Sequence, residues 1–443
     1  MSGIAELLLN LGYKVSGSDL ASTWITQRLA SLGGTIFQGH TKDQIKGADV
    51  VVISSAVGQD NSEVAAAHKA AIPVIPRAEM LAELMRIKFS VAVAGAHGKT
   101  STTSMVASIL AQGGLDPTVV IGGKLKGIGS NAFLGQGEFI VAEADESDGS
   151  FLKYSPTIAV VTNIDHEHLD FYKDIDEIKA VFLSFIDRLP FYGTAVLCLD
   201  NEGIQELIPS IKKRFCTYGL TIQADLQARD ITFKQLQSRF NVFFKGNLLG
   251  EVALNLPGMH NVYNSLAGIS VGLELNIPFD IIKQALETIE GVARRLEIKG
   301  QVKGVTVLDD YGHHPTEIKT TLEAICKSWP GRRKVVVFQP HRYSRTQKLF
   351  DEFTRAFYQS DILIVMPIYP ASEKMIPGIT AGKLAKSIRA HGHKEVIYLS
   401  SVDECLTHLD ELIKTGDLIL TLGAGNVFKV GEAFLEKWKS SES

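Results

Sequence analysis

Residues 89–101 read FSVAVAGAHGKTS, and this stretch decides the fold. Phe89 to Ala94 is an apolar run that predicts a buried strand, Gly95 to Thr100 predicts a turn, and Thr100 to Gln112 predicts a helix. Strand, glycine turn and helix in this order present backbone N–H groups and the positive end of a helix to an anion. The Lys99 ammonium can reach β- and γ-phosphates, and the Thr100 hydroxyl can ligate Mg²⁺.

The glycine turn is shorter than the standard phosphate-binding loop. That pattern has a glycine six residues before the lysine, and Val93 stands there, so the motif is GxxGKT. A glycine turn before a helix without a ligand is the alternative. The full order of strand, turn, Lys-Thr and helix favours phosphate binding.

Composition excludes several classes of protein. The chain has 443 residues, 45 Lys plus Arg, 49 Asp plus Glu, a formal charge of −4, 45% hydrophobic and 21% charged residues. This is ordinary for a soluble globular protein of about three domains at ~150 residues each, and it gives no basic footprint for nucleic acid. No apolar run reaches the ~18 residues of a membrane span, and the N-terminus does not resemble a signal peptide. The cysteines are far apart, which favours a reducing cytoplasm over a disulfide framework or zinc cluster: Cys198, Cys216, Cys326 and Cys405.

The chain is predicted to form three α/β domains, at residues 1–88, 89–296 and 297–443. Strand-like runs alternate with helical ones, which predicts parallel sheets covered by helices. In the first domain the expected strands are residues 14–18, 35–37, 49–54 and 72–75. In the second they are 89–94, 139–142 and 158–162, with an antiparallel layer over 231–256 that turns near Gly246-Asn247. In the third they are 305–310, 334–338, 362–366, 396–399 and 418–422.

Polar side chains follow two strands of the second domain. Glu143 to Asp148 comes directly after one strand, and Asn163 to Asp170 follows another. Ligands bind at the carboxyl ends of strands in open α/β sheets, so one carboxylate can hold Mg²⁺ beside Thr100. An acidic solvated turn and a polar loop are the alternatives.

Two further segments carry candidate ligands. His260 and Asn261 precede a helix expected over 262–275, where Asn261 either reads an adenine edge or caps the helix. Arg294 and Arg295 lie in the linker before the third domain, where an arginine either contacts a γ-phosphate or forms a surface salt bridge.

The first two strands of the third domain end in polar loops. One is DDYGHHPTE at 309–317, and the other is QPHRYSR at 339–345. Two arginines and a histidine suit recognition of a small carboxylate, although arginine-rich loops are often only solvated.

Taken together, these motifs resemble the Mur ligase family. The resemblance extends over essentially the whole chain, from MSGIAE at the N-terminus through AGAHGKTST, EADESDGSF, HNVYNSLAG, DDYGHHPTE and FQPHRYSRT to Gly423-Ala-Gly-Asn426. It implies three α/β domains: a Rossmann-like UDP-sugar domain, a central P-loop ATPase-like domain with a mainly parallel sheet and a small antiparallel layer, and a Rossmann-like domain for the amino acid.

The resemblance also implies roles for individual residues. The ATP phosphates would lie on Gly95, Ala96, His97, Gly98, Lys99, Thr100 and Ser101. Mg²⁺ would be held by Thr100, Glu143 and His168, with Glu146 as a substitute for Glu143. Other ATP contacts would be His260, Asn261, Arg295 at the γ-phosphate and Asp310. The alanine pocket would contain His341, Arg342 and Arg345, and the UDP-sugar would meet Ser54, Ser55, Ala56 and Asn131.

Two features depart from the family. Several relatives carry a carbamylated lysine about fourteen residues past the metal-binding histidine, where this chain reads Ala180-Val181-Phe182. We therefore expect no carbamate, which a mass spectrum can check. Family members also begin with a strand and a Gly-rich loop that run into MSGIAE, whereas this chain starts at the last Gly of that loop. Weak UDP-sugar binding is the expectation for a chain that starts at Met1.

The implied reaction is an ATP-dependent amide ligation in peptidoglycan synthesis. UDP-N-acetylmuramate would form an acyl phosphate, and L-alanine would displace the phosphate. Lys99, Arg295 and Mg²⁺ would supply charge, and His341 is a candidate base. The enzyme is expected in the cytoplasm as a monomer or weak homodimer, with no nucleic acid or membrane partner. The alternatives are a ligase that recycles a muramyl tripeptide, a P-loop NTPase without ligase activity, and a nicotinamide dehydrogenase. No complete GxGxxG follows a strand to support the last.

Overall fold

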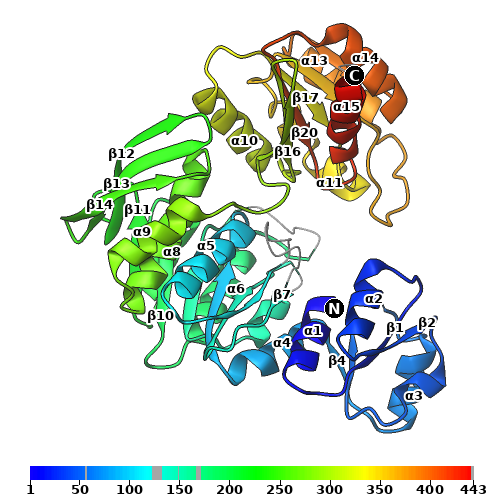
Figure 1. Ribbon diagram of the computed structural model, residues 1–443, viewed down its shortest axis with the longest axis vertical. Helices are drawn as coiled ribbons and strands as arrows, with labels where there is room; N and C mark the ends of the chain where they lie inside the picture. The colour runs from blue at the N-terminus through cyan, green and yellow to red at the C-terminus, as the bar shows by residue number, and fades with distance from the viewer. Residues whose placement is uncertain (55–56, 122–131, 148, 166–170, 441–443) are drawn as a thin grey trace. The chain divides into compact units, whose positions relative to one another are not determined.

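The computed structural model describes residues 1–54, 57–121, 132–147, 149–165 and 171–440 (Figure 1). The chain divides into two compact units. The first contains Met1–Asp230, Phe240–Val252 and Tyr263–Glu290, and the second contains Ile231–Arg239, Ala253–Val262 and Gly291–Ser443. The α/β class is confirmed, whereas the domain boundaries at 88/89 and 296/297 stay predictions.

The N-terminal segment alternates helices and short strands as expected, but in the described residues 1–54 and 57–88 the strands form two separate pairs. Strand β1 (Ser16–Asp19) pairs in parallel with β2 (Thr35–Gln38), and β3 (Val51–Ile53) pairs in parallel with β4 (Val74–Pro76). Alternation predicts parallel strands but not which strands are neighbours, so the expected single sheet is corrected to two pairs. The helices are α1 (Ser2–Asn10), α2 (Trp24–Ser31), α3 (Ser62–Lys69) and α4 (Arg77–Arg86).

The central sheet has ten strands in the order β14-β13-β12-β11-β10-β9-β5-β8-β6-β7. Strand β5 (Phe89–Ala94) is parallel to both neighbours, β8 (Phe139–Glu143) and β9 (Ile158–Val161), which agrees with the sequence prediction. Its residues from Ser90 to Ala94 are fully buried, as the apolar run requires. The remaining strands toward the hairpin edge are β10 (Thr194–Cys198), β11 (Phe215–Gly219), β12 (Leu226–Lys234), β13 (Gln237–Phe244) and β14 (Asn247–Leu254). Those at the other edge are β6 (Thr118–Val120) and β7 (Ala132–Phe133).

The antiparallel layer predicted over 231–256 continues this sheet. Two-residue links join β12 to β13 and β13 to β14, and such short links connect only antiparallel neighbours. Lys245 and Gly246 form the second link with φ values of +48° and +81°. Two consecutive positive φ angles match the right-handed twist of a hairpin, so the turn lies where the sequence placed it.

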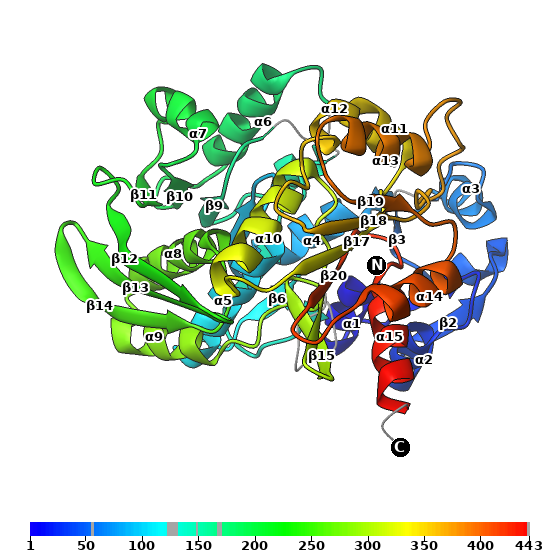
Figure 2. The same cartoon turned by 90° about the horizontal axis from the view of Figure 1, so that it is seen from above.

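Helices cover the sheet, and glycines let two of them approach closely (Figure 2). Helix α5 (Lys99–Gln112) packs near α8 (Met259–Glu274), where a Cβ added at Gly268 or Gly272 would lie 3.1 Å or 2.9 Å from side-chain atoms of Ile109. The other helices of this unit are α6 (Ile175–Asp187), α7 (Glu202–Leu207) and α9 (Phe279–Thr288). In the described part of the chain, no helix combines the length and hydropathy needed to cross a membrane.

The second unit has a six-stranded sheet in the order β15-β16-β20-β17-β18-β19. The five expected strands are present as β16 (Val305–Asp310), β17 (Lys334–Phe338), β18 (Ile362–Val365), β19 (Val396–Tyr398) and β20 (Leu418–Leu422), all parallel. The sequence analysis missed the antiparallel edge strand β15 (Glu297–Val302). Apolar clusters lie on both faces of the sheet. The helices are α10 (Pro315–Ser328), α11 (Tyr343–Lys348), α12 (Phe350–Phe353), α13 (Ala381–Ala390), α14 (Val402–Leu412) and α15 (Phe428–Ser440).

Candidate active site

The glycine turn between β5 and α5 has the conformation that its glycines predict. Gly95 has φ +133° and Gly98 has φ +82°, and Gly98 caps the N-terminus of α5. A Cβ at Gly95 would collide with the Thr162 hydroxyl, and one at Gly98 would lie 2.5 Å from Asn264 Oδ1. Glycine is therefore required at both positions by backbone angle and by space.

Lys99 is held by its own turn and by one carboxylate. Its Nζ donates to Gly95 O at 2.7 Å, to Ala96 O at 3.2 Å and to Glu146 Oε1 at 2.8 Å. Burial opposes the charge, but the carboxylates of Glu146 and then Glu143 outweigh it and raise the pKa of Lys99. The ammonium group is therefore charged at neutral pH and lies at the start of the helix.

The structure gives the two candidate carboxylates different partners. Thr100 Oγ1 donates to Glu143 Oε2 at 3.0 Å, whereas Glu146 pairs with Lys99. Both Thr100 and Glu146 are buried, and the Tyr172 hydroxyl donates to the Glu146 main-chain oxygen. A hydroxyl and a carboxylate oxygen side by side are a donor set that Mg²⁺ accepts. This arrangement favours Glu143 over Glu146 as the metal ligand.

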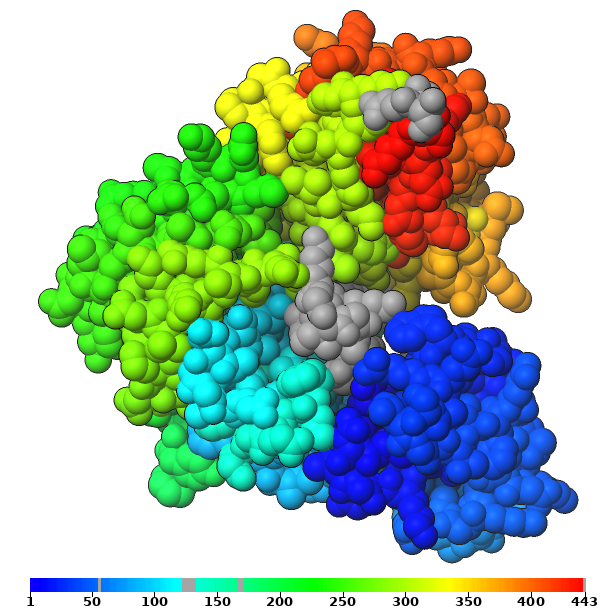
Figure 3. Space-filling model, in the orientation of Figure 1, coloured from blue at the N-terminus to red at the C-terminus, as the bar shows by residue number. Residues whose placement is uncertain are grey.

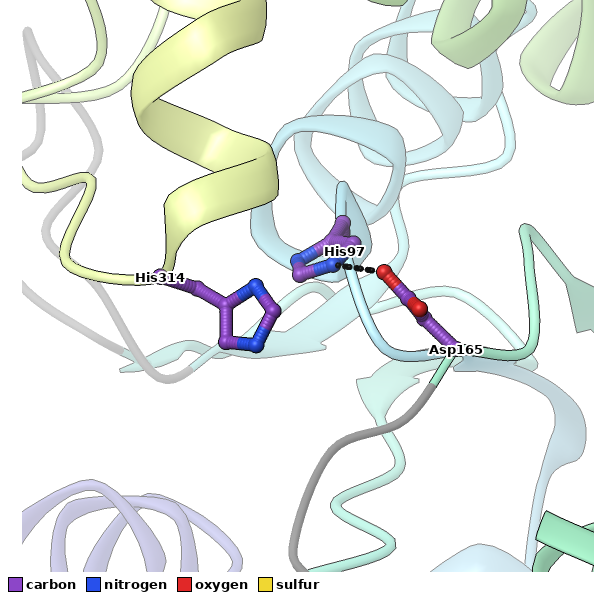
Figure 4. A group of neighbouring side chains, drawn as sticks. All are labelled: His97, Asp165 and His314. Atoms are coloured by element: carbon purple, nitrogen blue, oxygen red, sulfur yellow. Dashed lines mark hydrogen bonds and ion pairs between the residues drawn. The ribbon is translucent and has the colours of Figure 1, made fainter. Parts of the chain in front are cut away.

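The segment after β9 binds the glycine turn tightly. His97 N donates to Asn163 Oδ1 at 2.8 Å, and Asn163 Nδ2 donates back to His97 O at 3.0 Å. The Thr162 hydroxyl donates to the same His97 oxygen at 2.7 Å. Figure 4 shows the His97 ring facing Asp165, with Nε2 3.1 Å from Oδ2. The turn is thus fixed by a neighbouring strand end as well as by its own glycines.

Several expected ligands lie outside the described residues, namely Ser55, Ala56, Asn131 and His168. Ser54 is described and directly follows β3, with its carbonyl accepting from Val57 N at 3.0 Å. Ligands bind at the carboxyl ends of strands in such sheets. The position of Ser54 is therefore compatible with the predicted contact to the UDP-sugar, which stays a prediction.

His260 and Asn261 lie inside the first turn of α8. The helix begins at Met259, so the expected start at 262 is wrong, and of the two alternatives for Asn261 the N-cap is excluded. Asn261 Nδ2 instead donates to Pro257 O at 2.8 Å. Burial, aided by the charge of Arg295, lowers the pKa of His260 to about 4, and its buried Nδ1 has no hydrogen-bond partner among the described residues.

The two linker arginines have distinct environments. Arg294 Nε lies 2.9 Å from Asp309 Oδ2, and its Nη atoms donate to the carbonyls of Gly423 at 2.5 Å and Gly425 at 3.0 Å. Among the described residues, the ion pair of Arg295 is a long contact of 3.7 Å to Glu317, and its guanidinium lies over the Tyr311 ring at 5.3 Å. The guanidinium of Arg294 is therefore already bound by a carboxylate and main-chain carbonyls, whereas the position of Arg295 suits a ligand contact.

Asp310, at the end of β16, is buried and accepts several hydrogen bonds. They come from Leu296 N at 2.7 Å, Gly312 N at 2.8 Å and the Thr321 hydroxyl at 3.3 Å. Burial raises the pKa of Asp310 to about 6 against the opposing charge of Arg295. These contacts tie the linker to the loop after β16.

His341, Arg342 and Arg345 gather at the end of β17 and the start of α11. The His341 ring stacks on Tyr369 at 5.5 Å between centroids, and Arg345 Nη1 lies 3.3 Å from His341 Nδ1. Arg342 has φ +69°, and its N–H donates to Tyr369 O at 2.8 Å. Burial and the charges of Arg345 and Arg342 lower the pKa of His341 to about 4, so the imidazole is neutral at pH 7.

Four residues that shape these sites received no individual role from the sequence: Thr162 and Asn264 were not selected, and Asn163 and Arg294 were named only within their segments. Thr162 and Asn163 follow a strand that pairs with β5, so their place at a strand's carboxyl end was an available signal. Asn264 lies one turn after His260 on α8 and accepts from the Thr102 hydroxyl at 3.2 Å. Nothing in the sequence distinguishes Arg294 from Arg295.

A parallel sheet whose central strand leads through a glycine turn into a helix headed by Lys-Thr defines an α/β phosphate-binding protein. Three family models match the chain: the Mur ligase family catalytic domain over residues 1–89, the Mur ligase middle domain over 93–272, and the Mur ligase glutamate ligase domain over 294–425. The chain belongs to the Mur ligase family.

Its curated relatives include two proteins named UDP-N-acetylmuramate–L-alanine ligase. The protein from Desulfatibacillum aliphaticivorans is 66% identical over 98% of this chain and 95% of its own length. The protein from Geobacter sulfurreducens is 57% identical over 99% of this chain and 95% of its own length.

Solved structures of ligases are similar to this chain along nearly its whole length. The UDP-N-acetylmuramate-alanine ligase MurC from Thermotoga maritima matches with a TM-score of 0.81 and 27% identity, covering 100% of this chain and 97% of its own. A murein peptide ligase from Psychrobacter arcticus matches with a TM-score of 0.69 and 25% identity over 98% and 96% of the two chains.

Proposed function

We propose that this protein joins L-alanine to UDP-N-acetylmuramate with the conversion of ATP to ADP, a step of peptidoglycan synthesis. The observation that carries the proposal is the 66% identity to a ligase of that name along nearly the full length of both chains. The Lys99-bearing turn at the head of α5 supplies the phosphate site that such a ligase needs. We expect it to act in the cytoplasm as a monomer or weak homodimer.

The muramoyl carboxylate attacks the γ-phosphate, and ADP leaves. Lys99 and Arg295 are the cations proposed to stabilise the charge that develops in this transfer. Lys99 suits the role because its neighbours keep it protonated inside a largely buried site. Arg295 suits it because its contact to Glu317 is long enough to be exchanged for a phosphate.

Mg²⁺ is proposed to bind Thr100 and Glu143, whose oxygens are 3.0 Å apart. Mg²⁺ prefers oxygen ligands and usually keeps waters and substrate phosphates, so two protein oxygens are a sufficient start. When bound, the ion neutralises repulsion between a carboxylate and a triphosphate. His168 remains the third proposed ligand.

The other substrate contacts are proposed from the family resemblance. Ser54, Ser55 and Asn131 would meet the UDP-sugar, His260 and Asn261 the adenine, and Asp310 the ATP. Asp310 would act through the loop it holds, because its oxygens already accept from Leu296, Gly312 and Thr321.

Arg342 and Arg345 are proposed to receive the alanine carboxylate, since guanidinium groups match carboxylate geometry. The amine must attack the acyl phosphate unprotonated. His341 is neutral at pH 7, so a ring nitrogen has a lone pair, and His341 is proposed to accept the amine proton.

The test is ADP release from ATP with UDP-N-acetylmuramate, measured with and without L-alanine and with a muramyl tripeptide in its place. We expect turnover that requires L-alanine and a UDP-N-acetylmuramoyl-alanine product by mass spectrometry. Turnover with the tripeptide alone would establish the recycling ligase instead. ATP hydrolysis that ignores both acceptors would establish a P-loop NTPase.

A further inference from the structure

We propose that Asn163, supported by Thr162, is a positioning residue that presets the phosphate turn for ATP. This inference rests on the proposed ATP-dependent function and concerns residues to which no part in nucleotide binding was assigned above. It starts from an unusual pairing: one side-chain amide binds both the N–H and the C=O of a single residue of the turn, His97, at 2.8 Å and 3.0 Å.

The pairing fixes both orientation and position. The amide can satisfy His97 only with Oδ1 toward its N–H and Nδ2 toward its C=O, so the side chain has one possible orientation. The Asn163 main-chain oxygen also accepts from Ala96 N at 3.1 Å. Asn163 therefore holds three consecutive peptide units of the turn.

Thr162 adds a second donor to the main-chain oxygen of His97. Its hydroxyl is 2.7 Å from His97 O and 3.3 Å from Ala94 O, and its side chain is buried. It lies where a Cβ at Gly95 would be, so the glycine and the threonine form one close approach between β5 and the end of β9.

These contacts decide which amides face the phosphates. The N–H groups of Ala96 and His97 point at Asn163, so they do not contribute to the phosphate site in this arrangement. The cradle then consists of Lys99 and the first amides of α5, which have no carbonyl partner within a helix. By holding residues 96–97, Asn163 aims Gly98, Lys99 and Thr100 before ATP arrives.

Because the turn is already ordered, ATP binding does not have to bear the entropic cost of ordering it. The effect of losing Asn163 should therefore appear in the affinity for the nucleotide. Replacing Asn163 by Ala removes two side-chain hydrogen bonds of ordinary strength. We expect the KM for ATP and the Kd for ADP to rise about tenfold, while the KM for L-alanine stays within about twofold.

Thr162 provides a matched pair of variants. Thr162→Val removes the hydroxyl and keeps the shape, and Thr162→Ser keeps the hydroxyl. We expect Thr162→Val to raise the KM for ATP about threefold to tenfold and Thr162→Ser to restore it to within about twofold of the wild type. Asn241→Ala, a surface change on β13, controls for loss of an asparagine.

The measurements separate the two claims. If the wild type shows no alanine-dependent ADP release, the proposed function fails, whatever the variants do. If the wild type is active and Asn163→Ala binds ADP as tightly as the wild type in calorimetry, the positioning role is wrong. Equal losses in the ATP and L-alanine parameters with a lowered Tm would also overturn it, because that pattern reports general damage. An unfolded Asn163→Ala leaves the Thr162 pair to decide.

Discussion

Lys99 Nζ and Glu146 Oε1 are 2.8 Å apart in a buried ion pair at the head of α5. The lysine is proposed to serve ATP, whereas the glutamate keeps it charged and in place. Lys99→Ala should lower kcat at least ~10³-fold, because charge stabilisation of phosphoryl transfer depends on it. ADP release is the measurement, and Lys153→Ala, which breaks an exposed pair with Glu79, should leave it unchanged.

Lys99→Ala should also reduce the stability of the protein, because Glu146 would lose its cationic partner in a buried site. Breaking a buried pair costs about 3 kcal/mol, whereas replacing both partners by neutral groups costs much less. Lys99→Met with Glu146→Gln should therefore recover most of the free energy of unfolding in urea without recovering activity. Recovery of activity in the double variant would contradict the role of Lys99.

Helix α5 offers a second contrast, between the glycines at its two ends. Gly98 and Gly114 have similar φ values of +82° and +75°, but a Cβ at Gly98 would lie 2.5 Å from Asn264 Oδ1, and one at Gly114 has no neighbour within 4 Å. Gly98→Ala should weaken ATP binding at least ~100-fold, since the turn must move. Gly114→Ala should cost only about 1 kcal/mol of stability from its backbone angle and keep the KM for ATP unchanged. Equal effects on KM would show that the turn tolerates a side chain.

These contrasts also show what the sequence could predict. The apolar run 89–94, the glycines and Lys99 each act through local chemistry, so strand, turn and helix were predictable from neighbouring residues. The five parallel strands of the second unit were predictable for the same reason. Strand pairing was not, because it depends on contacts between residues far apart in the chain, and so the N-terminal pairs were missed. The missed strand β15 is a different case, because it pairs with β16, its neighbour in the sequence.

Side-chain partners within the site were the least predictable part. Asn163 and His97 are 66 residues apart in sequence, and only the pairing of β5 with β9 brings them together. The residue types alone do not distinguish Glu143 from Glu146, yet Glu143 accepts from Thr100 and Glu146 accepts from Lys99. Asn261 was predicted equally well as a helix cap, and the three extra residues at the start of α8 decide against that alternative.

Arg294 should matter mainly for folding. Its guanidinium binds the buried Asp309 and the carbonyls of Gly423 and Gly425 and lies 4.7 Å from the Phe428 ring. Arg294→Ala should lower the free energy of unfolding by roughly 3–5 kcal/mol, and Arg294→Lys should recover only part, because an ammonium cannot reproduce the fork. Arg214→Ala, which removes a more exposed pair with Glu274, should cost under about 1 kcal/mol. A small effect of Arg294→Ala on the free energy of unfolding in urea would refute the structural role of Arg294.

His313 should make the stability of the second unit depend on pH. Burial, with the charge of Arg345 and the neighbouring His341, lowers the pKa of the His313 imidazole to about 3 despite Glu317, and the main-chain N–H of His313 donates to Glu317 Oε2 at 2.9 Å. Since an unfolded histidine has a pKa of about 6.5, the unfolded chain takes up a proton below that pH before the folded chain does. Stability is therefore complete above pH 6.5 and falls as the pH drops from 6.5 toward 3.

Between pH 7 and pH 5 this one group should cost about 2 kcal/mol of unfolding free energy. His313→Asn should remove that part of the slope, because an asparagine does not titrate and can still donate to the carbonyl of Tyr311, the partner of His313 Nδ1 at 3.1 Å. His341 shares the cluster and should leave a residual slope of the same sign. Urea unfolding at half-unit pH steps measures both chains, with His68→Asn on the exposed face of α3 as the control. A slope in His313→Asn identical to that of the wild type would mean that the pKa of His313 is the same in the folded and the unfolded chain, which would contradict this prediction.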